Sequence, residues 1–255
     1  FSMHAREVLN NACVMTELLD DLGGAPLSHD TIYQALGVGS EAIEIVAGTE
    51  LRQAGSLSAV LRATGEPSCT VFLKKVTASM VAGKPWNDRR RVLLYIRNEL
   101  RFYTEFAHLL GERGVRAPVL RHSVGENLDG LESYEEEPPP ALLERCGALM
   151  FLEPLSQGYM QASPLTPAQA RHVLVAAARL HAAAWESVPT LERAARRLQR
   201  HGGSFALSAR NPKELRELPE SWARFAAAFA PEAPPGFFDR PEIARLGTRL
   251  QAAAP

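Results

Sequence analysis

The hydrophobic pattern of this chain changes character between residues 153 and 164. Before that point, short apolar runs of the strand type lie between turn signals. After it, apolar residues recur almost entirely at helical spacing. A chain patterned in this way is expected to fold into a sheet-bearing part followed by a helical part, so the predicted fold class is α+β.

Five runs of the first part are predicted to form a mainly antiparallel sheet. They cover residues 42–51, 57–64, 69–77, 118–124 and 148–153. Turn signals at 53–56 and 64–67 separate the first three, which therefore read as a meander. One long helix is predicted over residues 88–110, where Leu93, Ile96 and Leu100 begin a helical repeat.

The remaining predicted elements are helices. A first helix is expected over residues 4–21, and Ser28 is placed to cap a short one that ends at Leu36. Thr166-Pro167 is a start signal for a helix that runs to about Glu186. Further helices are predicted near 190–200, 212–229 and 241–253, with a break in the third at Pro219. The predicted domains are an N-terminal helical segment at 1–39, a sheet-bearing lobe at 40–153 and a partial helical lobe at 154–255.

Composition gives no sign of nucleic-acid or membrane binding, and it indicates the cellular compartment in which the chain is expected. The formal net charge is -1, so no overall field favours nucleic acid or an anionic membrane. No apolar run reaches the ~18 residues that a membrane span needs. The three cysteines lie far apart, which predicts a reducing compartment, and we expect a cytoplasmic protein. The basic clusters at 89–91 and 193–200 are predicted to be solvated helix faces, and the acidic, proline-rich stretch 132–140 an exposed loop.

Lys74 interrupts an apolar strand, Val71-Phe72-Leu73-Lys74. Two interpretations stay open at this point. The lysine could belong to an edge strand and face water, or it could hold nucleotide phosphates and pair with a glutamate of a helix. Lys75 follows directly and faces the opposite side of the strand, so one of the two lysines is expected to point outward.

Glu99 is the candidate partner of Lys74. It lies on the long helix that follows the strand, and Phe102 and Tyr103 come three and four residues later on the same helix face. The carboxylate should therefore point toward an apolar interface, where it needs a cation. We predict an ion pair between Lys74 and Glu99 with an N–O distance within ~4 Å, and we expect Phe72 to share the strand face of Lys74.

Two other segments are candidates for contact with a ligand. The turn that contains Gly55 and Ser56 joins the first two predicted strands, where a kinase-like fold has the hairpin that covers phosphates. Glu153 and Leu155 follow the last predicted strand, at the junction between the two parts of the chain. A hinge at that junction would offer backbone groups to a nucleotide base.

Taken in order, these motifs resemble the ecdysteroid-kinase-like (CHK kinase-like) family, which belongs with the aminoglycoside phosphotransferases and choline kinases. The matching stretches are Val71–Val76, Asn98–Tyr103, Met150–Leu155, Leu180–Trp185 and Arg210–Leu218. The resemblance covers residues 40–255. It implies a two-lobed protein-kinase-like fold, with an N-lobe of a five-strand antiparallel sheet plus a long helix, and an incomplete helical C-lobe. It also implies ATP with Mg²⁺ and transfer of a phosphoryl group to a hydroxyl of a small-molecule acceptor, whose identity the sequence does not give.

Position by position, the resemblance assigns candidate cofactor-binding residues. Lys74 matches the phosphate-binding lysine and Glu99 its partner, while Glu153 and Leu155 match the hinge. The family's catalytic loop, with a His-Gly/Asn-Asp start and a later asparagine, is not found in these 255 residues, and His201-Gly202-Gly203 has glycine where the aspartate should stand. The resemblance places that loop after Pro255.

The sequence leads to three alternative functions. The first is a small-molecule kinase whose catalytic loop lies outside this sequence, so that the chain as given is inactive and contains no catalytic or metal-binding residues. The second is a non-catalytic pseudokinase that serves as a binding or scaffold module, and the third is an unrelated α+β protein. An incomplete helical lobe would expose apolar surface, so self-association through that lobe is also expected.

Overall fold

The structure is a computed structural model that describes residues 17–38, 43–49, 51–53, 55–64, 69–155, 164–199 and 212–253. The chain divides into two compact units, residues 1–198 and 199–255. Most of the helix predicted over 4–21 lies outside the described residues, and so does the segment 201–203.

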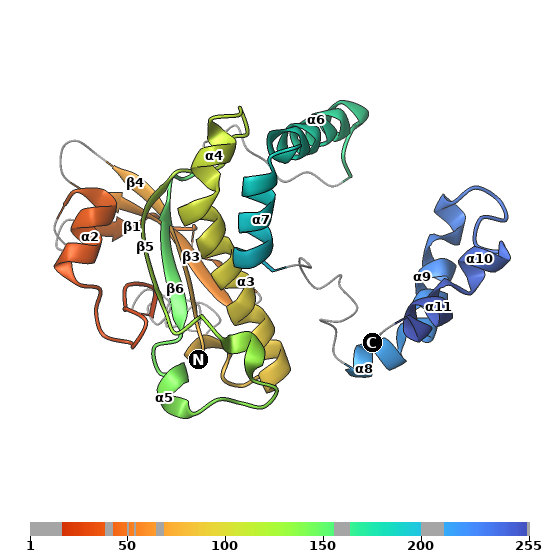
Figure 1. Cartoon of the computed structure of the whole chain (residues 1–255), viewed down its shortest axis with the longest axis horizontal. Coiled ribbons are helices and arrows are strands. Elements are labelled where there is room, and N and C mark those ends of the chain that lie inside the picture. Colours follow the sequence, from red (N-terminus) through yellow and green to blue (C-terminus); the bar gives the residue numbers. More distant parts are fainter. Residues whose placement is uncertain are drawn as a thin grey trace, which may run out of the picture. The chain divides into compact units, whose positions relative to one another are not determined.

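The first unit is built on a six-stranded antiparallel sheet (Figure 1). The strands are β1 (Ile43–Ile45), β2 (Leu51–Gln53), β3 (Ser56–Ala63), β4 (Thr70–Thr77), β5 (Leu120–Glu126) and β6 (Gly147–Leu152). Their order is β1-β3-β4-β6-β5, and β2 also pairs with β3. This arrangement confirms the α+β class and the antiparallel sheet.

The prediction of a first strand over 42–51 was wrong in extent: β1 covers only Ile43–Ile45, and a sixth strand, β2, begins at Leu51 and ends at Gln53, where a turn was expected. Gly48 has φ +77°, a left-handed conformation that strands do not contain. The Thr49 hydroxyl donates to the carbonyl of Val46 at 2.5 Å and accepts from the amide of Val60 at 3.0 Å. This turn interrupts the pairing with β3, so β1 and β2 form separately along the same neighbour.

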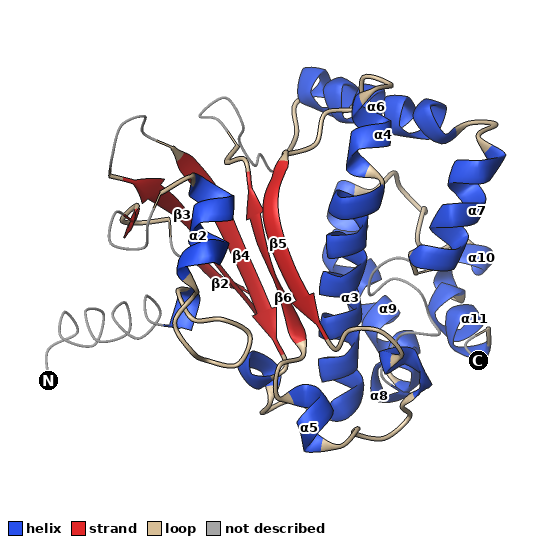
Figure 2. Ribbon diagram, turned by 60° about the vertical axis from the view of Figure 1, so that its left-hand side comes forward, coloured by secondary structure: helices blue, strands red, loops and turns tan. Residues whose placement is uncertain are grey.

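The described part of the first unit also contains six α-helices. They are α2 (His29–Leu36), α3 (Trp86–Glu105), α4 (Ala107–Gly111), α5 (Pro140–Leu143), α6 (Pro167–Ala184) and α7 (Val188–Arg197). The predicted caps are confirmed: the Ser28 hydroxyl accepts from the amide of Thr31, and Thr166 forms a capping box with Gln169. Figure 2 shows α2 and α3 on opposite sides of the sheet.

The core has two layers, one on each face of the sheet. Along β6, Leu149 and Phe151 join the layer that includes α2, whereas Ala148, Met150 and Leu152 join the layer beneath α3. All six residues of β6 are buried. The continuous apolar run of this strand therefore reflects a central strand covered on both faces.

One of the two basic clusters is not a solvated face. Arg89 on α3 is only 7% exposed, and its guanidinium donates to Glu137 at 2.5 Å. Arg97, two turns later, pairs with Glu132 at 2.5 Å. The prediction was therefore wrong for the first cluster, because the acidic stretch 129–137 runs along α3 and covers its arginines. In the second cluster, Arg197 stays half-exposed but pairs with Glu105 of α3 at 2.6 Å.

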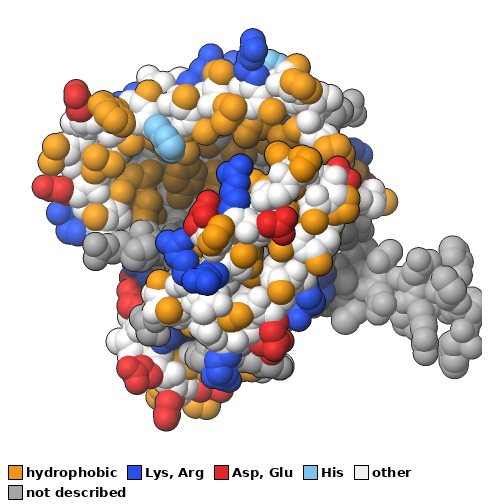
Figure 3. All heavy atoms as spheres, turned by 90° about the vertical axis from the view of Figure 1, so that its right-hand side faces the viewer, with side chains coloured by type: hydrophobic (Ala, Val, Ile, Leu, Met, Phe, Trp, Pro, Cys, Tyr) orange, Lys and Arg blue, Asp and Glu red, His pale blue; other side chains and the backbone are white. Residues whose placement is uncertain are grey.

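Helix α6 carries apolar side chains that no other described residue covers, so they are exposed to solvent. Leu174 is 69% exposed, and Trp185, which follows the helix, is 72% exposed. Val173 and Leu180, which the sequence places on the apolar face of this helix, are also exposed. Hydrophobic side chains are prominent on the surface drawn in Figure 3 as well.

The described part of the second unit, 212–253, consists of helices joined by turns. It contains α8 (Pro212–Arg216), α9 (Leu218–Phe229), α10 (Pro241–Ala244) and α11 (Leu246–Ala252). The predicted break at Pro219 is confirmed, since α8 ends just before it and Pro219 lies in the first turn of α9. Trp222 holds the unit together: its indole donates to the carbonyl of Ile243 at 2.7 Å and stacks on Phe225.

Candidate functional site

Lys74 and Glu99 form an ion pair between β4 and α3. The Nζ of Lys74 lies 2.5 Å from Oε2 of Glu99, which confirms the predicted contact. The side chains are 27% and 30% exposed, so a ligand can reach the pair from solvent. A pair that is partly shielded from water interacts more strongly than one on an open surface.

The alternation of β4 positions this lysine. Phe72, Lys74 and Val76 share the face toward α3, where Val76 is buried and Phe72 packs against the same apolar layer. On α3, Ile96 enters this layer one turn before Glu99. The ion pair therefore lies at the margin of the apolar contact between sheet and helix.

Lys75 faces the opposite side of the sheet and is almost completely buried, with 3% exposure. Its ammonium donates to the carbonyl of Glu17 at 2.5 Å and to that of Asp20 at 2.9 Å. Burial lowers the pKa of Lys75, although the nearby carboxylates of Asp20 and Glu17 act in the other direction. The expectation that one of the two lysines points outward was wrong, because the segment before α2 covers this face of β4.

The hairpin between β2 and β3 places Gly55 where a side chain would not fit. Gln53 and Ser56 are paired across the turn, and the Ser56 hydroxyl donates to the carbonyl of Gln53 at 2.8 Å. Gly55 has φ +94°, and a Cβ there would lie 2.5 Å from Cγ1 of Val81. The glycine therefore permits a close contact between the hairpin and the segment that precedes α3. Ser58, two residues after Ser56, pairs with Lys74 in the sheet.

Glu153 and Leu155 follow β6, and both are exposed. The amide of Glu153 donates to the carbonyl of Val119 at 2.8 Å, which fixes the chain as it leaves the sheet. Met150, three residues earlier, pairs with Lys74 in the sheet. The hinge candidates thus follow the strand next to Lys74, although no hydrogen bond or ion pair joins them to it among the described residues.

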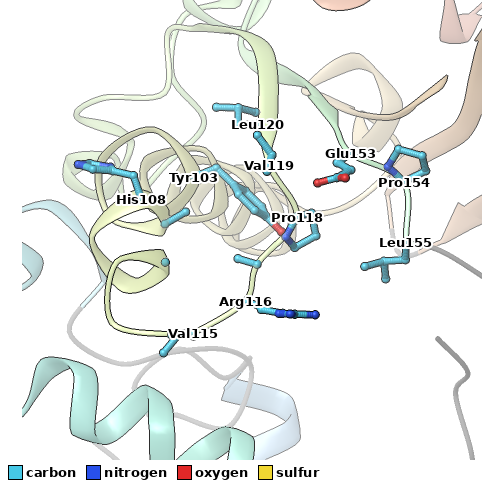
Figure 4. Close-up of a pocket in the computed structure, with 14 residues that line it drawn as sticks. Tyr103, His108, Val115, Arg116, Pro118, Val119, Leu120, Glu153, Pro154 and Leu155 are labelled. Carbon is cyan, nitrogen blue, oxygen red and sulfur yellow. The ribbon is translucent and has the colours of Figure 1, made fainter. Parts of the chain in front are cut away.

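A cavity of about 790 Å³ adjoins the hinge candidates, and we call it the α4 pocket. It is bounded by the C-terminal part of α3, by α4, by residues 114–119 and by residues 153–155. Tyr103 projects into it (Figure 4). Burial and the charge of Glu99, one turn earlier on α3, raise the pKa of Tyr103.

Sequence reasoning missed two nitrogen-bearing side chains of this pocket, those of His108 and Arg116. His108 lies on the short helix α4, and Arg116 lies in the connection that leads to β5. Neither belongs to a motif, and a single arginine before Ala117-Pro118 carries no signal of its own. They reach one cavity because the chain turns after α4 and runs through residues 114–119 into β5, beside residues 153–155.

Comparison with known proteins gives no match: no family model, no curated protein and no solved structure is significantly similar to the chain. Within the described ranges, no helix is long and apolar enough to cross a membrane. The same ranges contain no group of three or more His, Cys, Asp or Glu side chains that could hold a metal ion.

Proposed function

We propose that the chain binds ATP with Mg²⁺ through a protein-kinase-like N-lobe and belongs to the small-molecule phosphotransferases that the ecdysteroid-kinase-like family represents. The ion pair between Lys74 and Glu99 carries this proposal. A lysine on an internal strand that is paired with a glutamate on the following long helix is the arrangement by which kinases position nucleotide phosphates.

The order of elements around the pair supports the same function. The glycine hairpin precedes β3, the lysine stands on β4, and the helix with the glutamate comes before the last two strands. The sheet places the final strand β6 beside β4, so the chain leaves the sheet next to the lysine. A nucleotide could then contact the hairpin, the lysine and the segment after β6 together.

Each candidate residue has a specific role in this proposal. The ammonium of Lys74 binds phosphate oxygens, and Glu99 holds that ammonium in place. Gly55 and Ser56 bring backbone amides over the phosphates. Backbone groups of the segment from Glu153 to Leu155 contact the base. The family's acceptor is a hydroxyl of a small molecule, and the described residues do not define its site.

Phosphoryl transfer itself needs a base and ligands for Mg²⁺. No cluster in the described ranges fits such a metal ion, and the sequence contains no His-Gly/Asn-Asp loop. When bound with ATP, Mg²⁺ would neutralise negative charge on the phosphates. Lys74 supplies positive charge at the site described above, and the proposal for this chain concerns nucleotide binding.

A thermal-shift titration tests the proposal. ATP with MgCl₂ should raise the melting temperature of the wild-type chain, because a ligand that binds only the folded state stabilises it. Lys74→Ala should reduce the shift. Arg62→Ala is the matched control, since Arg62 forms an ion pair with Glu44 across β1 and β3, away from α3. An equal shift in the wild type and in Lys74→Ala would refute the assignment of Lys74.

A further inference from the structure

The α4 pocket carries two opposite charges at separate places on its wall. Figure 4 shows Glu153 and Arg116 on either side of Pro118, with both side chains at the cavity. Both residues are exposed, and neither has an ion-pair partner within the part of the chain that the structure describes. A ligand could therefore satisfy both charges without breaking an existing ion pair.

The surface between these charges is largely apolar. Pro118 lies between them, the ring of Tyr103 projects toward Pro118, and Leu155 lines the pocket nearby. The phenol of Tyr103 is uncharged at neutral pH, as tyrosine ordinarily is, and burial raises its pKa further. A cavity of this size that has an apolar wall and few polar groups has the usual character of a small-molecule site.

We propose that the α4 pocket binds an organic zwitterion whose carboxylate and ammonium groups are separated by an apolar body. The carboxylate pairs with Arg116, the ammonium pairs with Glu153, and the body packs on Pro118 and the ring of Tyr103. An anion alone would leave Glu153 without a partner, and a cation alone would leave Arg116 without one. The pocket should therefore discriminate against both. This inference does not depend on nucleotide binding.

Three probes of nearly the same shape test the proposal by isothermal calorimetry. They are para-(aminomethyl)benzoate, which carries both charges, para-toluate, which lacks the ammonium, and para-methylbenzylamine, which lacks the carboxylate. For the wild-type chain, the zwitterion should bind roughly tenfold more tightly than either singly charged probe, since one well-placed ion pair of about 1.4 kcal/mol changes affinity tenfold.

Two variants assign the charges. Arg116→Gln should remove the advantage of the zwitterion over the amine, whereas Glu153→Gln should remove its advantage over the acid. Both side chains are exposed, so both variants should fold, which circular dichroism will show. Arg62→Gln, on β3, is the control and should bind all three probes as the wild type does.

The proposal is overturned if the zwitterion does not bind, if the three probes bind equally, or if both variants bind the zwitterion as tightly as the wild type. ATP is left out of these titrations, because the proposed nucleotide hinge shares residues 153–155 with the pocket. Failure of ATP to bind would refute the proposed function but would leave this inference intact. The two proposals can therefore fail separately.

Discussion

The ammonium of Lys75 donates to the backbone carbonyl of Asp20 at 2.9 Å, on the face of β4 opposite to the ion pair of Lys74. Adjacent lysines thus have different structural roles. Lys74 is open to a ligand, whereas Lys75 attaches the segment before α2 to the sheet. Their different burial leads to the first prediction.

Lys75→Ala should lower the free energy of unfolding by about 2 kcal/mol. The substitution removes two hydrogen bonds from a charged donor, so the carbonyls of Glu17 and Asp20 lose the ammonium as a partner. Lys74→Ala should change stability much less, since its side chain is more exposed and its ion pair is partly solvated. Urea denaturation of both variants measures the difference. Equal losses would contradict the separate roles.

Glu105 should make stability depend on pH in the acid range. The hydrogen bond from Arg197 is the main reason that the pKa of Glu105 lies below its ordinary value of 4.5. Because the folded pKa is lower than the unfolded one, the unfolded state binds more protons between the two values. The stabilisation is therefore fully present above the unfolded value and is lost as the pH falls through the folded value.

Glu105→Gln provides the measurement of this effect. The difference in unfolding free energy between wild type and variant should be constant at neutral pH. It should begin to shrink as the pH falls below about 4.5, where the unfolded chain takes up the proton first, and should be lost as the pH falls through the lower folded pKa. Urea titrations at a series of pH values would show it. A difference that does not change with pH would mean that the pairing of Glu105 with Arg197 does not stabilise the fold.

Gly55 and Gly48 form a matched pair of substitution sites. Both have positive φ, so alanine is strained at either position. A Cβ at Gly48 has open space, whereas a Cβ at Gly55 would lie 2.5 Å from Cγ1 of Val81. Gly48→Ala should therefore cost about 1 kcal/mol, and Gly55→Ala should cost clearly more because the hairpin must also move. Equal losses in denaturation experiments would show that Val81 does not limit the hairpin.

The exposed apolar residues of α6 should favour self-association. Leu174 and Trp185 each expose more than two-thirds of their surface, and exposed apolar patches promote association between copies. The double variant Leu174→Gln, Trp185→Ser should shift the chain toward monomer in light scattering at a matched concentration. If the wild-type chain is already monomeric across the concentration series, this prediction is wrong.

Local pattern predicted most of the secondary structure. The predicted strands at 57–64, 69–77 and 148–153 agree with β3, β4 and β6 within a residue or two, because an apolar run between turn signals has few alternatives. The first strand failed at Gly48, since its pattern shows apolar residues but not the positive φ that breaks the ladder.

Long-range packing accounts for the features that the sequence did not reveal. The carbonyl of Glu17 accepts a hydrogen bond from Lys75, 58 residues later in the chain. Arg89 is paired with Glu137, 48 residues later. Hydrophobic periodicity contains no information on which loop covers which charge. The ion pair of Lys74 with Glu99 could be predicted because both positions belong to regular elements that face the same interface.

The most direct test of the central claim compares ATP with adenosine in equilibrium titrations of the wild-type chain and of Lys74→Ala. If Lys74 binds phosphates, the variant should lose tenfold or more in affinity for ATP, on the order of 1.4 kcal/mol, while its affinity for adenosine stays unchanged. Glu99→Gln should show a smaller loss in the same direction, because it loosens the lysine without removing it. An ATP affinity that Lys74→Ala leaves unaltered would contradict the account.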